Sequence, residues 1–106
     1  MVKRFDVYLL SLDEPQSKNA RNTRPCVIVS PDEMNENLPH VLIAPISTSV
    51  RKFPTRIGFE FLNRERTIVV DQLRAVETSR LVKKIGEVDA TTQTRLLKCL
   101  ADLFAE

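Results

Sequence analysis

With 106 residues, of which 42% are hydrophobic, the chain is long enough for one modest core and too short for two. Its net charge of +2 is too small to indicate a nucleic-acid-binding protein by itself. No apolar run approaches the roughly 20 residues that span a bilayer, and the N-terminus lacks the apolar stretch of a signal peptide. We therefore expect one domain over residues 1–106, with no membrane contact, in the cytoplasm.

The chain begins with two predicted strands separated by a polar loop. Residues 5–12 are rich in Val, Tyr and Leu, which is typical of a strand. Residues 13–23 form a polar stretch that is long for a hairpin, and a long loop is a candidate for function. Residues 25–29 are almost continuously apolar, as expected of a strand that is buried on both faces.

A short helix is predicted to follow the second strand and to end near Asn37. Ser30 is the expected N-cap, Pro31 occupies the first helical position, and Glu33 completes a capping box. These residue types in this order are a known signature of a helix start.

The middle of the chain predicts further short strands. Residues 41–44 form an apolar strand that runs into Pro45, which has no N–H to donate to a ladder. Residues 55–61 alternate, residues 62–65 form a turn, and residues 67–70 form the partner strand. A single helical turn at 77–81 and a last short strand at 82–88 complete this part.

The C-terminal segment predicts an amphipathic helix. Asp89 is the expected N-cap, and the apolar residues then recur at helical spacing. The stripe consists of Leu96, Leu97, Leu100, Leu103 and Phe104. We expect a mainly β fold with helices, in which a small, strongly bent sheet or barrel is closed by this helix.

The most informative pattern is an arginine at the mouth of one strand and hydroxyls at the end of another. Arg24 leads into the strand at 25–29, and Ser47 and Thr48 follow the strand at 41–44. A guanidinium gives a phosphate two hydrogen bonds at once, and a hydroxyl is a short additional donor. The pattern predicts a phosphate site, although a salt bridge for Arg24 and a plain polar loop for the hydroxyls are the alternatives.

Basic residues cluster in two acid-free stretches. Residues 18–24 carry Lys18, Arg21 and Arg24, and residues 47–57 carry Arg51, Lys52 and Arg56. In the functional interpretation, folding brings both stretches to one groove. In the alternative, they are solvated loops that keep the protein soluble.

The remaining polar candidates give weaker signals. His40, the sole histidine, follows a proline at a strand entrance without any motif, so we expect a surface position and not acid-base catalysis. Asp71 ends an apolar strand, where it can orient a base, accept from a nucleobase or pair with a cation. Cys26 and Cys99 have no metal-ligand spacing, so we expect reduced core residues, no metal site and no cofactor.

Several of these segments resemble the MazF/PemK family of bacterial toxins. The resemblance rests on Thr23-Arg24-Pro25, Ala44-Pro45-Ile46-Ser47 and Asp71-Gln72-Leu73-Arg74, and it extends over nearly the whole chain. It implies a small SH3-like barrel of the CcdB/PemK type that forms a homodimer. It also implies a metal-independent endoribonuclease that cuts single-stranded mRNA and is neutralised by a cognate antitoxin.

The resemblance also implies roles for individual residues. Arg24 and Ser47 match the catalytic positions, and Asp71 and Gln72 match positions that line the RNA groove. The predicted substrate-binding set is completed by Lys18, Arg21, Thr48 and Arg51.

In the implied reaction the 2′-hydroxyl attacks the phosphorus and leaves a 2′,3′-cyclic phosphate. The loop departs from the family, because Ser17-Lys18-Asn19 replaces the common Gly-x-Glu. That departure keeps two alternatives open, a non-enzymatic gyrase poison like CcdB and a nucleic-acid-binding module on the same fold.

Overall fold

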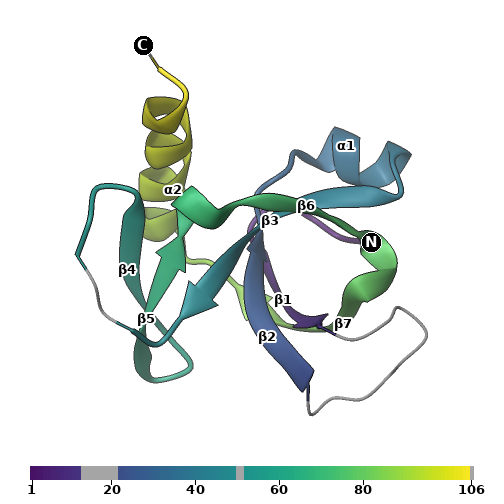
Figure 1. Cartoon of the computed structure of the whole chain (residues 1–106), viewed down its shortest axis with the longest axis horizontal. Coiled ribbons are helices and arrows are strands. Elements are labelled where there is room, and N and C mark those ends of the chain that lie inside the picture. The colour runs from purple at the N-terminus through teal and green to yellow at the C-terminus, as the bar shows by residue number, and fades with distance from the viewer. Residues whose placement is uncertain (13–21, 50–51, 106) are drawn as a thin grey trace.

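The computed structural model describes residues 1–12, 22–49 and 52–105 (Figure 1). Within these ranges no helix is both long and apolar enough to cross a membrane. The elements in chain order are β1 (Asp6–Ser11), β2 (Thr23–Ile28), α1 (Asp32–Asn37), β3 (His40–Ser47), β4 (Arg56–Phe61), β5 (Arg64–Val69), η2 (Val70–Gln72), β6 (Arg74–Glu77), η3 (Thr78–Arg80), β7 (Leu81–Glu87) and α2 (Ala90–Leu103).

The strands form one curled, antiparallel, seven-stranded sheet organised on β3. The order is β4-β5-β3-β2-β1-β7, and β6 also pairs with β3. One edge of β3 pairs with β2, where Ile43 lies opposite Ile28. The other edge pairs first with β6, where Ile43 lies opposite Arg74, and then with β5, where Ser47 lies opposite Thr67. The short turn η2 joins these two strands, so the sheet bends into a half barrel (Figure 1).

Side-chain alternation on the central strands fills two cores. On β2, Cys26 and Ile28 face one cluster while Val27 faces the other. The inner cluster lies within the curl of the sheet and consists of Leu10, Cys26, Ile28, Val41, Ile43 and Val76. The outer cluster joins the opposite face of the sheet to α2 and the β4-β5 hairpin. The predicted burial of this strand on both faces is confirmed.

The C-terminal helix begins where the sequence predicts. The Asp89 carboxylate accepts from the Thr92 backbone N–H at 3.3 Å, which caps the first turn. Leu96 is fully buried in the outer cluster. The predictions for Leu97 and Phe104 are wrong, because these side chains are 42% and 74% exposed. Leu97 follows Leu96 directly and is therefore rotated about 100° away from the buried stripe.

The predicted capping box at the first helix is also wrong. The helix α1 begins at Asp32, with Pro31 in the N-cap position and no side-chain cap. The Ser30 hydroxyl accepts from the Leu42 backbone N–H at 3.0 Å and contacts the Asn35 carboxamide. A buried backbone donor needs a partner, and Ser30 supplies it across the fold and not within the helix.

Strand boundaries differ most clearly from the predictions at β3, β6 and β5. The strand β3 continues through Pro45 to Ser47, and β6 was not predicted as a strand. The turn of the β4-β5 hairpin consists of Leu62 and Asn63 alone, with φ angles of 52° and 61°. Both angles are those of a two-residue hairpin turn that matches strand twist, so β5 starts at Arg64, earlier than predicted.

We expect Gly86→Ala to destabilise the fold. A Cβ at this position would lie 2.7 Å from the Phe61 ring, and the backbone φ is +158°. Overpacking of this kind costs about 1–3 kcal/mol of unfolding free energy, which urea denaturation measures. Gly58→Ala is the matched control, because a Cβ there meets nothing within 4 Å. Equal stability of the two variants would contradict the packing described for Phe61.

Candidate active site

Arg24 and Ser47 lie on the same face of neighbouring strands. The last β2-β3 pair joins Cys26 to Pro45, and Arg24 and Ser47 each lie two residues beyond it on their own strands, where β2 and β3 are no longer paired. Because side chains alternate along a strand, both residues point to the face that Cys26 occupies. Figure 1 shows the strands diverging at this end, where β3 turns away to pair with β5. Arg24 and Ser47 therefore lie at an open strand end, and their meeting around one phosphate stays a prediction.

Both side chains keep hydrogen-bonding capacity for a ligand. Arg24 is exposed, and its Nη1 donates to the Thr23 carbonyl at 2.9 Å. A guanidinium carries five N–H donors, and this bond uses one of them. The Ser47 Oγ accepts from the Ser49 backbone N–H at 3.0 Å, a bond that does not use the hydroxyl hydrogen. Thr48 is exposed beside it.

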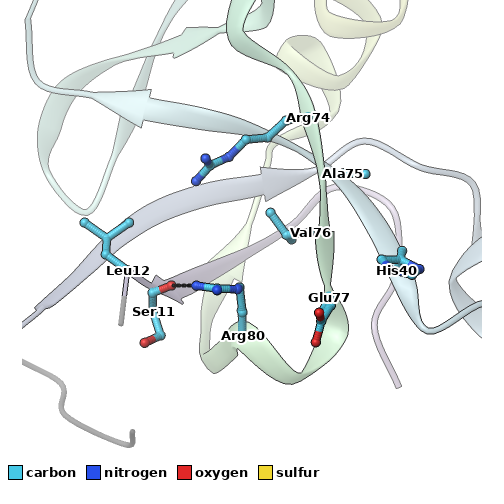
Figure 2. Close-up of a pocket in the computed structure, with 8 residues that line it drawn as sticks. All are labelled: Ser11, Leu12, His40, Arg74, Ala75, Val76, Glu77 and Arg80. Carbon is cyan, nitrogen blue, oxygen red and sulfur yellow. Dashed lines mark hydrogen bonds between the residues drawn. The ribbon is translucent and has the colours of Figure 1, made fainter. Parts of the chain in front are cut away.

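A hollow of about 460 Å³ opens at the mouth of the half barrel near Arg24. Ser11 of β1 lines the hollow, and the residue before it, Leu10, lies opposite Arg24 on β2. Figure 2 shows Arg74 and Arg80 on opposite sides of the hollow, with Val76 between them. Arg80 Nη1 donates to the Ser11 carbonyl at 3.4 Å, which ties η3 to the end of β1. The lining residues are Ser11, Leu12, His40, Arg74, Ala75, Val76, Glu77 and Arg80.

The charge of Arg74 reaches the strand that carries Arg24. Burial raises the pKa of the Cys26 thiol to about 12, while a hydrogen bond with the Tyr8 backbone and the positive charge of Arg74 oppose that rise. Arg24 lies two residues from Cys26 on the same face of β2. Arginines from β2, β6 and η3 therefore outnumber the one acid of the lining, Glu77, at the mouth of the half barrel, which favours an anion.

The sequence analysis did not identify Arg74 and Arg80 as site residues. Arg74 ended a family-like segment, but the strand β6 that aims it into the hollow was not predicted. The four residues Arg74–Glu77 do not alternate polar and apolar types, so no local pattern indicates this strand.

Asp71 lies in a different place from the arginine hollow. Its Oδ1 accepts from Thr55 Oγ1 at 2.9 Å and from Arg56 Nε at 3.3 Å, and its Oδ2 accepts from Arg56 Nη2 at 3.3 Å. Hydrogen bonding from Arg56 holds the pKa of the Asp71 carboxyl below its ordinary value. Of the roles considered for Asp71, the structure contains the ion pair. Gln72 is exposed next to it on η2.

Other predicted residues have varied outcomes. His40 is exposed at the start of β3, as predicted, and Figure 2 shows it at the rim of the hollow. Cys26 and Cys99 are buried free thiols, as predicted. In the described part of the chain, His, Cys, Asp and Glu form no group of three or more that could hold a metal ion. Lys18, Arg21, Arg51 and the Ser17-Lys18-Asn19 segment lie outside the described residues.

Comparisons with known proteins agree on one family. The family model of the PemK-like, MazF-like toxin of type II toxin-antitoxin systems matches residues 3–104. An endoribonuclease MazF from Staphylococcus epidermidis is 32% identical over 91 residues, which cover 80% of this chain and 76% of the relative.

Solved structures agree on the fold. An endoribonuclease in complex with its cognate antitoxin, from a mycobacterial species, superposes with a TM-score of 0.81 at 21% identity, covering 96% of this chain and 93% of that one. MazF in a MazE-MazF complex from Deinococcus radiodurans gives 0.80 at 16% identity, covering 98% and 95%. The SH3-like, CcdB/PemK-type barrel predicted from the sequence is confirmed.

We expect the Asp71 carboxyl to titrate at a lower pH than an unpaired aspartate. Carbon-13 NMR of the aspartate carboxyls measures this directly. Arg56→Gln removes the largest cause of the lowered pKa, so the midpoint of Asp71 should move up in pH. Lys98→Gln, which removes the exposed ion pair with Asp102, is the matched control and should leave Asp71 unchanged. An unchanged midpoint in Arg56→Gln would contradict the pairing.

Proposed function

Because the chain belongs to the PemK-like, MazF-like toxins of type II toxin-antitoxin systems, we propose that it is a metal-independent, sequence-selective endoribonuclease that cuts single-stranded mRNA. The observation that carries this proposal is the pair of diverging strand ends that carry Arg24 and Ser47 on one face, together with a hollow at the neighbouring end of β1 that Arg74 and Arg80 line. The relative described as an endoribonuclease MazF supports the reaction class.

The proposed chemistry uses the substrate's own nucleophile. The ribose 2′-oxygen forms a bond to phosphorus, the bond from phosphorus to the 5′-oxygen breaks, and the products are a 2′,3′-cyclic phosphate and a 5′-hydroxyl. The 2′-hydroxyl loses a proton to a base, and the leaving oxygen gains one. In the transition state, negative charge grows on the non-bridging phosphate oxygens. Hydrogen-bond donors that are already positioned around these oxygens lower the barrier most effectively.

The roles of the site residues follow from their donors. The Arg24 guanidinium gives two parallel hydrogen bonds to the phosphorane oxygens and protonates the leaving oxygen. The Ser47 hydroxyl donates to a non-bridging oxygen. Arg74 and Arg80 bind neighbouring phosphates in the hollow, where their charge contributes to affinity more than to the chemical step.

Partners and location are part of the same proposal. Two of the structural relatives are complexes of a toxin with its antitoxin, and we extend that partnership to this chain. We also propose a homodimer in the bacterial cytoplasm, with residues 1–106 forming one toxin domain.

Arg24→Ala should lower the cleavage rate about 10²- to 10³-fold or more, because it removes donors aimed at the developing charge. Primer-extension mapping on a long RNA in EDTA measures activity, metal dependence and sequence preference together. Ser47→Thr keeps a hydroxyl and should retain activity, whereas Ser47→Ala should lose it. Cleavage by a folded Arg24→Ala variant at the parent rate would overturn the role of Arg24, and failure of the parent in EDTA would overturn metal independence.

Arg74→Ala should weaken substrate binding more than it slows the chemical step. We expect a higher KM, a kcat within a few fold of the parent, and a salt dependence of binding whose slope falls by about 1. Arg64→Ala, an exposed cation beside the hairpin turn, is the control that should change neither quantity. A fall in kcat with an unchanged KM would show that Arg74 acts in the chemical step.

A further inference from the structure

A second hollow lies across the sheet from Ser47, on the strands β5 and β4. Ser47 lies opposite Thr67 on β5, and Thr67 lies opposite Gly58 on β4. Residues that are directly opposite point to the same face, and neighbouring strands lie about 4.8 Å apart. Gly58 is thus two strands from Ser47, about 10 Å away on the same face. A polymer held at Ser47 can continue over this surface.

The floor and one wall of the second hollow are built in a specific way. The cavity measures about 420 Å³ and contains Thr67 and Gly58 in its lining. At Gly58 a Cβ would meet nothing within 4 Å, so the floor is open and carries no side chain. Arg95 reaches over from α2, and its Nη1 donates to the Gly58 carbonyl at 2.8 Å. This bond holds a guanidinium at the wall of the hollow.

Phe53 is the aromatic side chain of this surface. It is 61% exposed, although Phe is a residue that usually contributes to a core. It lines the second hollow and also two adjoining ones of about 340 and 330 Å³. An exposed aromatic ring at the meeting point of several hollows is available for stacking.

Both cations and acids lie around Phe53. Lys52 and Arg56 flank it in sequence, and Arg95 lies across the hollow. The acids Glu60 and Glu65 also line the cavity, where they lie opposite one another on the hairpin, nearer to its turn. Arg56 is offset by Asp71, which leaves Lys52 and Arg95 as the cations that face a ligand.

We propose that Phe53 is a stacking platform for a base of single-stranded RNA beside the cleaved phosphate, with Lys52 and Arg95 contacting the phosphates. An aromatic ring among cations suits a single strand, because every base has a face that stacks and the backbone supplies the negative charge. This inference rests on the proposed function and deepens it, since the flanking base contributes to affinity and to the choice of site.

A tryptophan reporter tests the inference directly. The chain contains no Trp, so Phe53→Trp introduces a single tryptophan at the platform. The probe is a mixed-sequence, single-stranded RNA with 2′-O-methyl riboses, which cannot undergo attack by the 2′-oxygen. We expect its binding to quench the Phe53→Trp emission. Leu62→Trp, at the exposed hairpin turn, is the matched control and should not be quenched.

Affinity for the same RNA gives a second readout. Phe53→Ala should weaken binding by about 5- to 100-fold, the range expected for one stacked base, while Phe53→Tyr should stay within about twofold of the parent. Cleavage of a long RNA by the parent is measured in parallel.

Each result decides between the possibilities. If the parent cuts RNA but Phe53→Trp is not quenched and Phe53→Ala binds normally, the platform is wrong and the proposed function stands. If the parent neither cuts nor binds RNA, both fall. Emission that changes with protein concentration and not with RNA would show that a second copy of this chain covers Phe53, which also overturns the inference.

Discussion

The architecture depends on one constraint, which is that β3 uses a single edge for two partners. Its first half pairs with β6 and its second half with β5, while β2 occupies the other edge. Because β6 and β5 lie in different directions, β3 has to turn in order to hydrogen-bond with both. Pro45, which lacks an N–H, lies where the ladder between β3 and β2 ends. The turn separates Ser47 from β2 and opens the strand end at which Arg24 is exposed. The geometry of the site is therefore a consequence of how backbone hydrogen bonds are shared.

Local signals predicted the parts of the fold that depend on neighbours in sequence. A few neighbouring residues are enough to recognise the Asp89 cap and the helix that follows it. The same holds for Ile57 and Phe59, whose two-residue spacing puts both on the buried face of a strand. Ser30 was misread because its hydroxyl serves Leu42, a partner set by tertiary packing. The short strand β6 escaped prediction for a related reason, since its pairing with β3 joins segments far apart in the chain.

The candidate site shows the same division. Arg24 and Ser47 could be chosen as candidates because one leads into an apolar strand and the other follows one, a feature visible in sequence. Arg74 and Arg80 were missed because only the curl of the sheet brings β6 and η3 to the end of β1. The net charge of +2 also does not show how charge is distributed over the surface. Asp71 is paired with Arg56, whereas arginines from different elements of the fold lie near one another at the mouth of the half barrel. Where charges meet is a property of topology.

The bond between Arg95 and the Gly58 carbonyl has a consequence for association between molecules. The strand β4 is an outer strand of the sheet, and such strands offer backbone groups to which a strand from another chain can add. The guanidinium occupies one of those acceptors with a charged donor. A strand from another chain would have to displace the Arg95 guanidinium, and the displaced cation would then lie against the backbone of that strand. The hairpin can thus present an open, glycine-floored surface without recruiting strands that would extend the sheet into an aggregate.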